Sequence, residues 1–262
     1  MSASSALPPP ALHLSCAEVC DGGSREINQD RIGAARHGAL ACFVVADGAG
    51  GHKGGETAAA LVTDAVLDAF SARPGATAAD LTGYADAASA AVTRAQAASA
   101  SLAAMSSTLA AVVIDQAAAT AAWAHLGDSR IYLFRDGAVL YASVDHSLAQ
   151  QLITAGLTVQ ASVRRHPQRH VLYGAIGAEN GIDYAAGGAT LLAGDALLLC
   201  SDGLWQWIDE DAMLAALPAG GRSQDWLDAM CAASDHAAGA GTDGQRDNFS
   251  AYAICVHAGA AP

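Results

Sequence analysis

Short apolar runs recur along the chain and predict β-strands. They are rich in β-branched or aromatic residues and are bounded by turn-forming residues, as strands are. The runs cover residues 41–45, 109–114, 120–126, 131–134, 139–141, 196–200 and 249–256. Asp136 and Gly137 stand between two of them, and an Asp-Gly pair favours a two-residue hairpin turn. Part of the predicted sheet is therefore antiparallel.

Longer segments with helical spacing lie between the early strands. In residues 56–70 the apolar side chains return every three or four positions and form one stripe. A second long helix is predicted after Thr77, because Thr77 and Asp80 have the spacing of a capping box. Three shorter helices are predicted to begin at Ser147, Asp209 and Ser223. Strands and helices thus occur in groups, which favours an α+β domain with antiparallel sheets over a doubly wound parallel sheet.

The length and composition allow a full hydrophobic core. The chain has 262 residues, of which 52% are hydrophobic and 15% charged, so a disordered protein is excluded. This length permits one large domain or two small ones. We predict a flexible lead-in over residues 1–12, which contain a triple proline, and a single domain over residues 13–258.

The charge balance and the cysteines exclude several classes of protein. Acidic residues outnumber basic ones 26 to 13, and the net charge of −13 excludes binding to a nucleic-acid backbone. The six cysteines are scattered without a CxxC pair, which is typical of reduced thiols. The sequence before Arg25 lacks the pattern of a signal peptide, and no stretch is apolar enough to predict a membrane span. We therefore expect a cytoplasmic protein without nucleic-acid or membrane partners.

Candidate chemistry lies at the ends of the predicted strands, where aspartates recur. Three apolar runs end in an aspartate followed by a small residue, and two further aspartates stand just before strand-like runs. These five residues are Asp30, Asp47, Asp128, Asp202 and Asp247. If the strand ends converge, the carboxylates face one another, and such close like charges ionise together only when a hard divalent cation neutralises them. A single Asp-Gly pair usually marks only a turn, but Asp47 opens a glycine-rich segment that lets the backbone approach a small charged ligand.

Other catalytic patterns are absent or incomplete. Lys53 is followed by Gly54, so the glycine-rich segment is not a P-loop. The chain has neither an HExxH nor a GxSxG motif. Cys20 stands one residue too close to Arg25 for the thiolate loop of tyrosine phosphatases, and we interpret it as an ordinary thiol.

A series of short motifs gives the chain a resemblance to a known family. The motifs are REINQD (25–30), DGAGGH (47–52), ST (107–108), GDSR (127–130), VDHS (144–147), AIG (175–177), SDGL (201–204) and DN (247–248). Each is weak alone, but in this order they resemble the metal-dependent protein phosphatases of the 2C type, in their compact bacterial form, over nearly the whole chain. The resemblance implies a four-layer αββα sandwich, in which two antiparallel β-sheets are flanked by pairs of helices.

The resemblance also implies roles for the residues of the candidate site. Two Mn²⁺ or Mg²⁺ ions would be held by Asp47, the carbonyl group of Gly48, Asp202 and Asp247, with Asp30 binding directly or through water. Asp128 would form a third metal position with Asp202. Arg25 has the family position of the catalytic-site arginine that grips the substrate phosphate, for which a guanidinium fork is suited.

The activity implied by the resemblance is that of a serine/threonine phosphoprotein phosphatase. It would act as a monomer and oppose a bacterial serine/threonine kinase, its cognate partner. A hydroxide that bridges the two metal ions would attack phosphorus directly, without a protein nucleophile. The alternative is a catalytically idle homologue that binds phosphoproteins. Retention of all five aspartates favours the enzyme.

Two further assignments leave alternatives open. Ala49 stands where animal members of the family have a histidine, so His52 is the candidate catalytic acid; alternatively, His52 orders the glycine-rich loop, or a bound water donates the proton. Arg164 and Arg165 belong to a basic segment at the place of the family's flap and are candidate substrate-binding residues. The alternative is a solvated loop whose arginines pair with surface aspartates.

Overall fold

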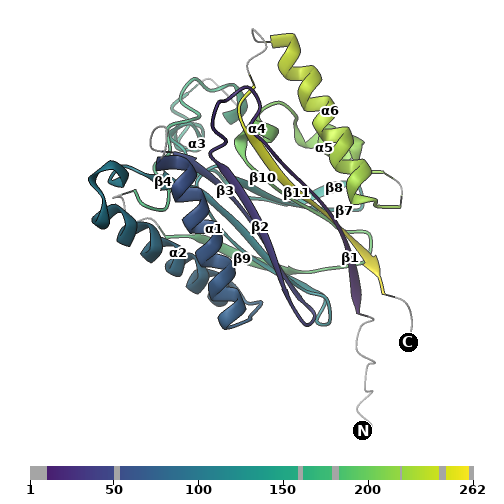
Figure 1. The fold of residues 1–262 in the computed structure, drawn as a ribbon. Coiled ribbons are helices and arrows are strands. Elements are labelled where there is room, and N and C mark those ends of the chain that lie inside the picture. Colours follow the sequence, from purple (N-terminus) through teal and green to yellow (C-terminus); the bar gives the residue numbers. More distant parts are fainter. Residues whose placement is uncertain are drawn as a thin grey trace.

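Two antiparallel β-sheets form the centre of the molecule (Figure 1). The computed structural model describes residues 11–49, 54–158, 162–178, 183–218, 220–241 and 246–259. The five-stranded sheet has the order β1 (Leu12–Asp21), β11 (Phe249–Ala258), β10 (Ala196–Cys200), β7 (Arg130–Arg135) and β8 (Ala138–Ala142). The six-stranded sheet has the order β2 (Asp30–His37), β3 (Leu40–Ala49), β5 (Leu109–Asp115), β6 (Thr120–Leu126) and β9 (Ala185–Thr190), and the short β4 (Ser106–Ser107) pairs with β3.

The two sheets pack face to face over an apolar core. Val112 and Ile114 of β5 point into this core, whereas Val113 points to the opposite face of the same sheet. Across the core, the rings of Phe43 on β3 and Tyr252 on β11 lie 5.3 Å apart. Burial on both faces explains why β5 is a continuous apolar run, and the contact between the inner faces is the main attraction that holds the sheets together.

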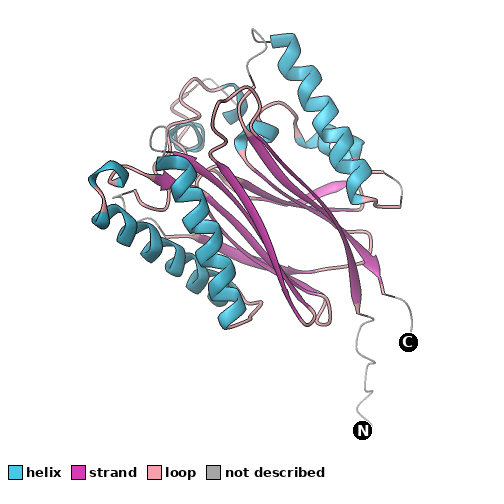
Figure 2. Ribbon diagram, in the orientation of Figure 1, coloured by secondary structure: helices cyan, strands magenta, loops and turns pink. Residues whose placement is uncertain are grey.

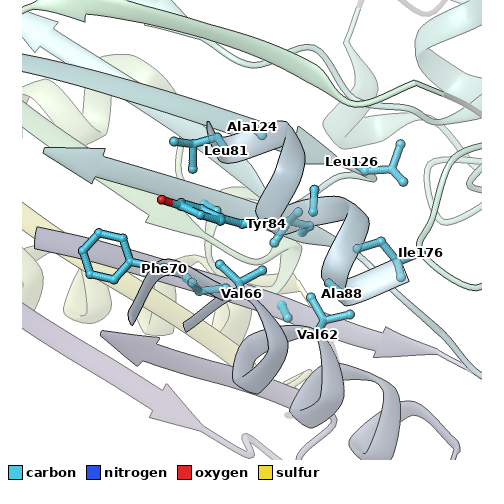
Figure 3. Close-up of a cluster of buried hydrophobic side chains, with 14 of the residues drawn as sticks. Val62, Val66, Phe70, Leu81, Tyr84, Ala88, Ala124, Leu126 and Ile176 are labelled. Atoms are coloured by element: carbon cyan, nitrogen blue, oxygen red, sulfur yellow. The ribbon is translucent and has the colours of Figure 1, made fainter. Parts of the chain in front are cut away.

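Helices cover the outer face of each sheet and complete four layers (Figure 2). The covering helices are α1 (Gly54–Ala72) and α2 (Ala78–Ala98) on the six-stranded sheet, and α4 (Asp202–Trp205), α5 (Glu210–Ala216) and α6 (Ser223–Gly241) on the five-stranded sheet. Figure 3 shows the cluster beneath α1 and α2, where the rings of Phe70 and Tyr84 meet edge to face. The apolar stripe predicted for residues 56–70 faces this cluster.

The predicted fold class is confirmed, and so are the local signals on which it rests. Every predicted apolar run lies inside a strand. Asp136 and Gly137 have φ angles of 51° and 73°, as a two-residue hairpin turn between β7 and β8 requires. Thr77 and Asp80 form the predicted capping box of α2. Ser147 caps the short helix α3 (Leu148–Thr154), Asp209 caps α5, and Ser223 begins α6.

Two edge strands were missed because their sequences contain no apolar run. β9 reads Ala-Ala-Gly-Gly-Ala-Thr and owes its extended form to pairing with β6. β1 mixes buried and exposed positions and pairs along its full length with β11. It begins at Leu12, the last residue of the predicted lead-in, and residues 1–10 lie outside the described ranges. None of the helices in the described part of the chain has both the length and the apolar character of a membrane span.

Candidate active site

Four of the five predicted aspartates line one cavity where strands of both sheets end. Asp47 stands near the end of β3, Asp128 between β6 and β7, Asp202 at the start of α4, and Asp247 just before β11. The fifth, Asp30, begins β2 and lies opposite Asp47 in the antiparallel ladder. The fold therefore brings together carboxylates that are far apart in the sequence.

Two of these aspartates are followed by glycine because another part of the backbone passes directly behind them. A Cβ atom at Gly48 would collide with the carbonyl oxygen of Gly55, and one at Gly203 would collide with that of Asn248. Only glycine allows so close an approach. The Asp-Gly pairs at Asp47 and Asp202 thus reflect packing of the site, whereas the pair at Asp136 is a hairpin turn.

Asp30 is buried, and both of its carboxylate oxygens accept hydrogen bonds. Ser201 Oγ donates to Oδ2 at 2.6 Å, and Asn248 Nδ2 donates to Oδ1 at 2.8 Å. Burial raises the pKa of Asp30 to about 6, although these hydrogen bonds favour the ionised form. Ser201 precedes Asp202 and Asn248 follows Asp247, so Asp30 connects the two sheets behind the cavity. The sequence placed Ser201 and Asn248 in motifs but gave them no role.

The remaining carboxylates repel one another. Burial raises the pKa of Asp47 well above its usual range, and the other four aspartates raise it further. Burial, followed by the charge of Asp202, likewise raises the pKa of Asp128. Cations placed among these groups reverse both effects, because they favour the ionised carboxylates.

One arginine, from the turn between β1 and β2, reaches the rim of the cavity. Arg25 donates from Nε to Asp247 Oδ1 at 2.8 Å and from Nη2 to Oδ2 at 2.7 Å. Its side chain is 62% exposed, so an incoming ligand has access to it. The site thus combines clustered carboxylates with an accessible guanidinium group.

The sequence of the chain matches one known protein family. The sequence profile described as protein phosphatase 2C matches residues 23–240. The chain belongs to the protein phosphatase 2C family.

Known relatives of this phosphatase 2C chain include mycobacterial proteins. The serine/threonine protein phosphatase PstP of Mycobacterium tuberculosis is 34% identical over 179 residues, which are 67% of this chain and 34% of PstP. The chain therefore spans about a third of the length of this curated relative. A crystal structure of M. tuberculosis PstP/Ppp has a TM-score of 0.79 and 28% identity, covering 93% of this chain and 99% of that chain. The PstP catalytic domain in complex with 2 manganese ions has a TM-score of 0.77 and 27% identity, covering 94% and 99%.

The oxygen donors of this phosphatase 2C cavity suit hard divalent cations. Within the described residues, no three side chains of His, Cys, Asp or Glu converge closely enough to enclose an ion by themselves. Mg²⁺ usually keeps several waters and binds through one or two carboxylates. Carboxylates spread around a cavity, where burial and the neighbouring negative charges raise the pKa values of Asp47 and Asp128, therefore fit hydrated cations.

Arg164 and Arg165 are not among the residues that line the cavity. Arg164 donates to Glu210 Oε2 at 3.0 Å and Oε1 at 2.9 Å, and its Nε donates to the carbonyl oxygen of Trp205 at 2.8 Å. Arg165 is exposed. Arg164 thus pairs with a half-buried glutamate, whereas the alternative interpretation expected surface aspartates.

His170 is the residue of this basic segment that lines the cavity. Its side chain is 55% exposed, and its Nδ1 lies 3.7 Å from Asp202 Oδ2. The charge pattern identified the segment but did not show which of its residues faces the site. The candidate acid His52 lies outside the described residues.

Proposed function

We propose that this chain is a metal-dependent phosphatase that hydrolyses phosphoserine and phosphothreonine in proteins. The observation that carries the proposal is the cavity lined by Arg25 and four aspartates, in a chain of the phosphatase 2C family. The cavity has a volume of about 170 Å³, smaller than the roughly 300–1,000 Å³ of typical organic-ligand pockets. This space suits a phosphoryl group and small ions. The name of PstP, a serine/threonine protein phosphatase, supports the substrate class.

The proposed metal ligands are oxygen atoms from both sheets. Two Mn²⁺ or Mg²⁺ ions are held by Asp47, the carbonyl group of Gly48, Asp202 and Asp247, and a third position is formed by Asp128 and Asp202. We place Asp30 behind these ligands, acting through water, because it is buried, does not line the cavity, and has neither oxygen free: both accept hydrogen bonds from buried side chains. Asp247, in contrast, lines the cavity and pairs with an exposed arginine, so an entering ion can take the place of the arginine in that pair. Bound ions supply charge stabilisation at the phosphoryl group and activation of the attacking water. The PstP catalytic domain with 2 manganese ions supports this choice.

Arg25 binds and orients the substrate in this proposal. Its guanidinium group presents two parallel N–H donors, a geometry that matches phosphate as well as carboxylate. Because carboxylates surround the cavity, a phosphate dianion is repelled unless positive charge meets it at the entrance. Arg25, exposed at the rim, supplies that charge.

We also propose a biological setting for this activity. Phosphoproteins are the substrates, so the enzyme, acting as a monomer, reverses the work of a serine/threonine kinase. A reducing cytoplasmic location is supported by the six cysteines, all of which are free thiols.

Hydrolysis of a phosphothreonine peptide tests the proposal. We expect phosphate release with Mn²⁺, none with excess chelator, and at least about 100-fold slower turnover for Asp202→Asn, which weakens metal binding. Asp136→Asn is the matched control, because Asp136 lies in an exposed turn with positive φ that asparagine accepts. Turnover unaffected by chelator and by Asp202→Asn would refute the metal mechanism. Folded protein that binds Mn²⁺ without hydrolysing any phosphopeptide would be the idle homologue.

A further inference from the structure

Thr108 forms hydrogen bonds with both the carbonyl oxygen and the N–H of Asp47. The Thr108 N–H donates to the carbonyl oxygen of Asp47 at 2.8 Å, and Thr108 Oγ1 accepts from the Asp47 N–H at 2.9 Å. Thr108 lies between β4 and β5, at a point where the pairing with β3 passes from one strand to the other. The position of Asp47 is therefore fixed by a side chain as well as by the ladder.

The same hydroxyl group contacts the loop that carries Asp128. Thr108 Oγ1 and Ser129 Oγ lie 2.7 Å apart, and either can be the donor. Thr108 is 3% exposed and Ser129 is fully buried, so water does not compete for this bond. Gly127 has a φ of 101°, and a Cβ atom there would lie 2.7 Å from Thr108 Cγ2. The Asp128 loop is thus packed directly against Thr108.

A third contact fixes the Asp128 loop from its other side. Trp205 Nε1 donates to the carbonyl oxygen of Asp128 at 2.8 Å, and Trp205 is buried beside Asp202. The loop consequently lies between the Trp205 indole and the Thr108 hydroxyl. A displacement of Asp128 therefore disturbs the hydrogen bonds that position Asp47.

We propose that the hydroxyl pair of Thr108 and Ser129 is a positioning link that couples cation binding at Asp47 to cation binding at Asp128. The proposal rests on the proposed function, in which these two aspartates serve different metal positions. Mg²⁺ demands near-ideal octahedral ligand geometry, so a buried link that fixes the separation of two ligands affects both sites. Energetic coupling of this kind travels through contiguous packed groups with defined arrangements.

Conservative variants separate this role from general stabilisation. Thr108→Val keeps the shape but leaves the Asp47 N–H without its side-chain acceptor and removes the link, whereas Thr108→Ser keeps the hydroxyl. Ser129→Ala removes the link alone and leaves the hydrogen bond from Asp47 to Thr108 in place. Thr63→Val is the matched control, because Thr63 is a buried threonine of α1 whose Oγ1 has no hydrogen-bond partner in the described part of the chain.

Mn²⁺ binding, measured by calorimetry and by electron paramagnetic resonance of free Mn²⁺, is the readout. We expect Thr108→Val to bind Mn²⁺ about 10- to 100-fold more weakly, the size seen when groups that support metal ligands are removed. Thr108→Ser should restore the affinity, and Thr63→Val should leave it unchanged. We expect Ser129→Ala to weaken the last ion bound while the first ions keep their affinity. Thermal denaturation with chelator shows whether each variant folds.

The outcomes distinguish failure of this link from failure of the proposed function. Wild-type protein that binds no Mn²⁺ would refute the function and the link together. Wild-type protein that binds Mn²⁺, with folded Thr108→Val and Ser129→Ala showing the same affinities, would refute the link alone. A Thr108→Ser variant as weak as a folded Thr108→Val would also contradict it, because the hydroxyl would then be irrelevant. If Thr108→Val does not fold, the Mn²⁺ affinities of Ser129→Ala test the link, and unchanged affinities refute it.

Discussion

Arg25 donates hydrogen bonds to both carboxylate oxygens of Asp247, from Nε at 2.8 Å and from Nη2 at 2.7 Å. Two residues separated by most of the chain thus form a two-pronged ion pair at the mouth of the cavity. The hydrogen bonds to Asp247, followed by its charge, raise the pKa of Arg25, so the guanidinium group stays charged. The carboxylate holds the arginine at the rim of the cavity, where an entering phosphate group can accept hydrogen bonds from the remaining N–H donors of the guanidinium group.

Arg25→Lys is expected to lower kcat/KM for a phosphothreonine peptide by about 10- to 100-fold, because lysine offers a point charge in place of two parallel donors and loses hydrogen bonds to a charged group. Steady-state kinetics with Mn²⁺ measure the change. Arg94→Lys on the exposed face of α2 is the control and should leave kcat/KM unchanged. Equal kcat/KM for Arg25→Lys and the wild type would remove Arg25 from substrate binding.

In the presence of chelator, the free energy of unfolding should decrease as the pH rises from about 4 to 7. The pKa of Asp30 is raised to about 6 in the folded protein, and those of Asp47 and Asp128 are raised as well. At these three carboxyl groups the folded protein therefore binds more protons than the unfolded chain in this range, and we expect this to outweigh the opposite effect of His125 and His146, whose pKa values are lowered by burial. The associated stability is present below the unfolded value, about 4, and is lost as the pH passes the folded values.

Thermal or urea denaturation across this pH range, with chelator and with saturating Mn²⁺, measures this dependence. Mn²⁺ should flatten it, because the cation binds the ionised carboxylates of the folded state. A chelated protein that becomes more stable between pH 5 and pH 7 would contradict the expectation.

Arg164→Ala should lower the free energy of unfolding by about 1–3 kcal/mol, because it removes hydrogen bonds between charged, half-buried groups and leaves Glu210 without this partner. Arg165→Ala, at the exposed neighbouring position, should change it by less than about 0.5 kcal/mol. Urea denaturation compares the two variants. A large loss of substrate affinity in Arg165→Ala would show that this arginine meets the substrate after all.

His170→Ala is expected to raise KM for phosphopeptides while kcat for p-nitrophenyl phosphate stays near the wild-type value. The imidazole stands at the rim of the cavity and is 55% exposed, where we expect the peptide part of a substrate to pass. Replacement of the exposed His37, at the far end of β2 from Asp30, is the control. If both substrates lose kcat equally, His170 acts on the phosphoryl group or on the metal ligands instead.

The aspartates and the fold class were predictable because their signals are local. Apolar runs ending in Asp47, Asp128 and Asp202 mark strand ends, and Thr77 with Asp80 marks a helix start whatever the rest of the chain does. The partners of Asp30 were not predictable in this way. Ser201 is 171 positions away and Asn248 is 218 positions away, and only the packed sheets bring their side chains to it.

The same limit applies to two other parts of the chain. The strand β9 has a sequence of alanine and glycine whose extended form comes from its neighbour β6. In the basic segment, composition gives the same weight to Arg164 and His170. In the structure Arg164 pairs with Glu210, a residue of another helix, and of the two only His170 lines the cavity.

The carboxylates of the site are divided between the two sheets: Asp30 and Asp47 belong to one, and Asp202 and Asp247 adjoin the other. An ion bound between them would connect the two sheets, so its binding energy would stabilise the packing of one sheet against the other. A change in the core, such as repacking of the Phe43–Tyr252 contact, would shift one sheet against the other and alter metal affinity without touching a ligand. The affinity of this fold for metal ions therefore depends on how the two sheets are aligned with each other.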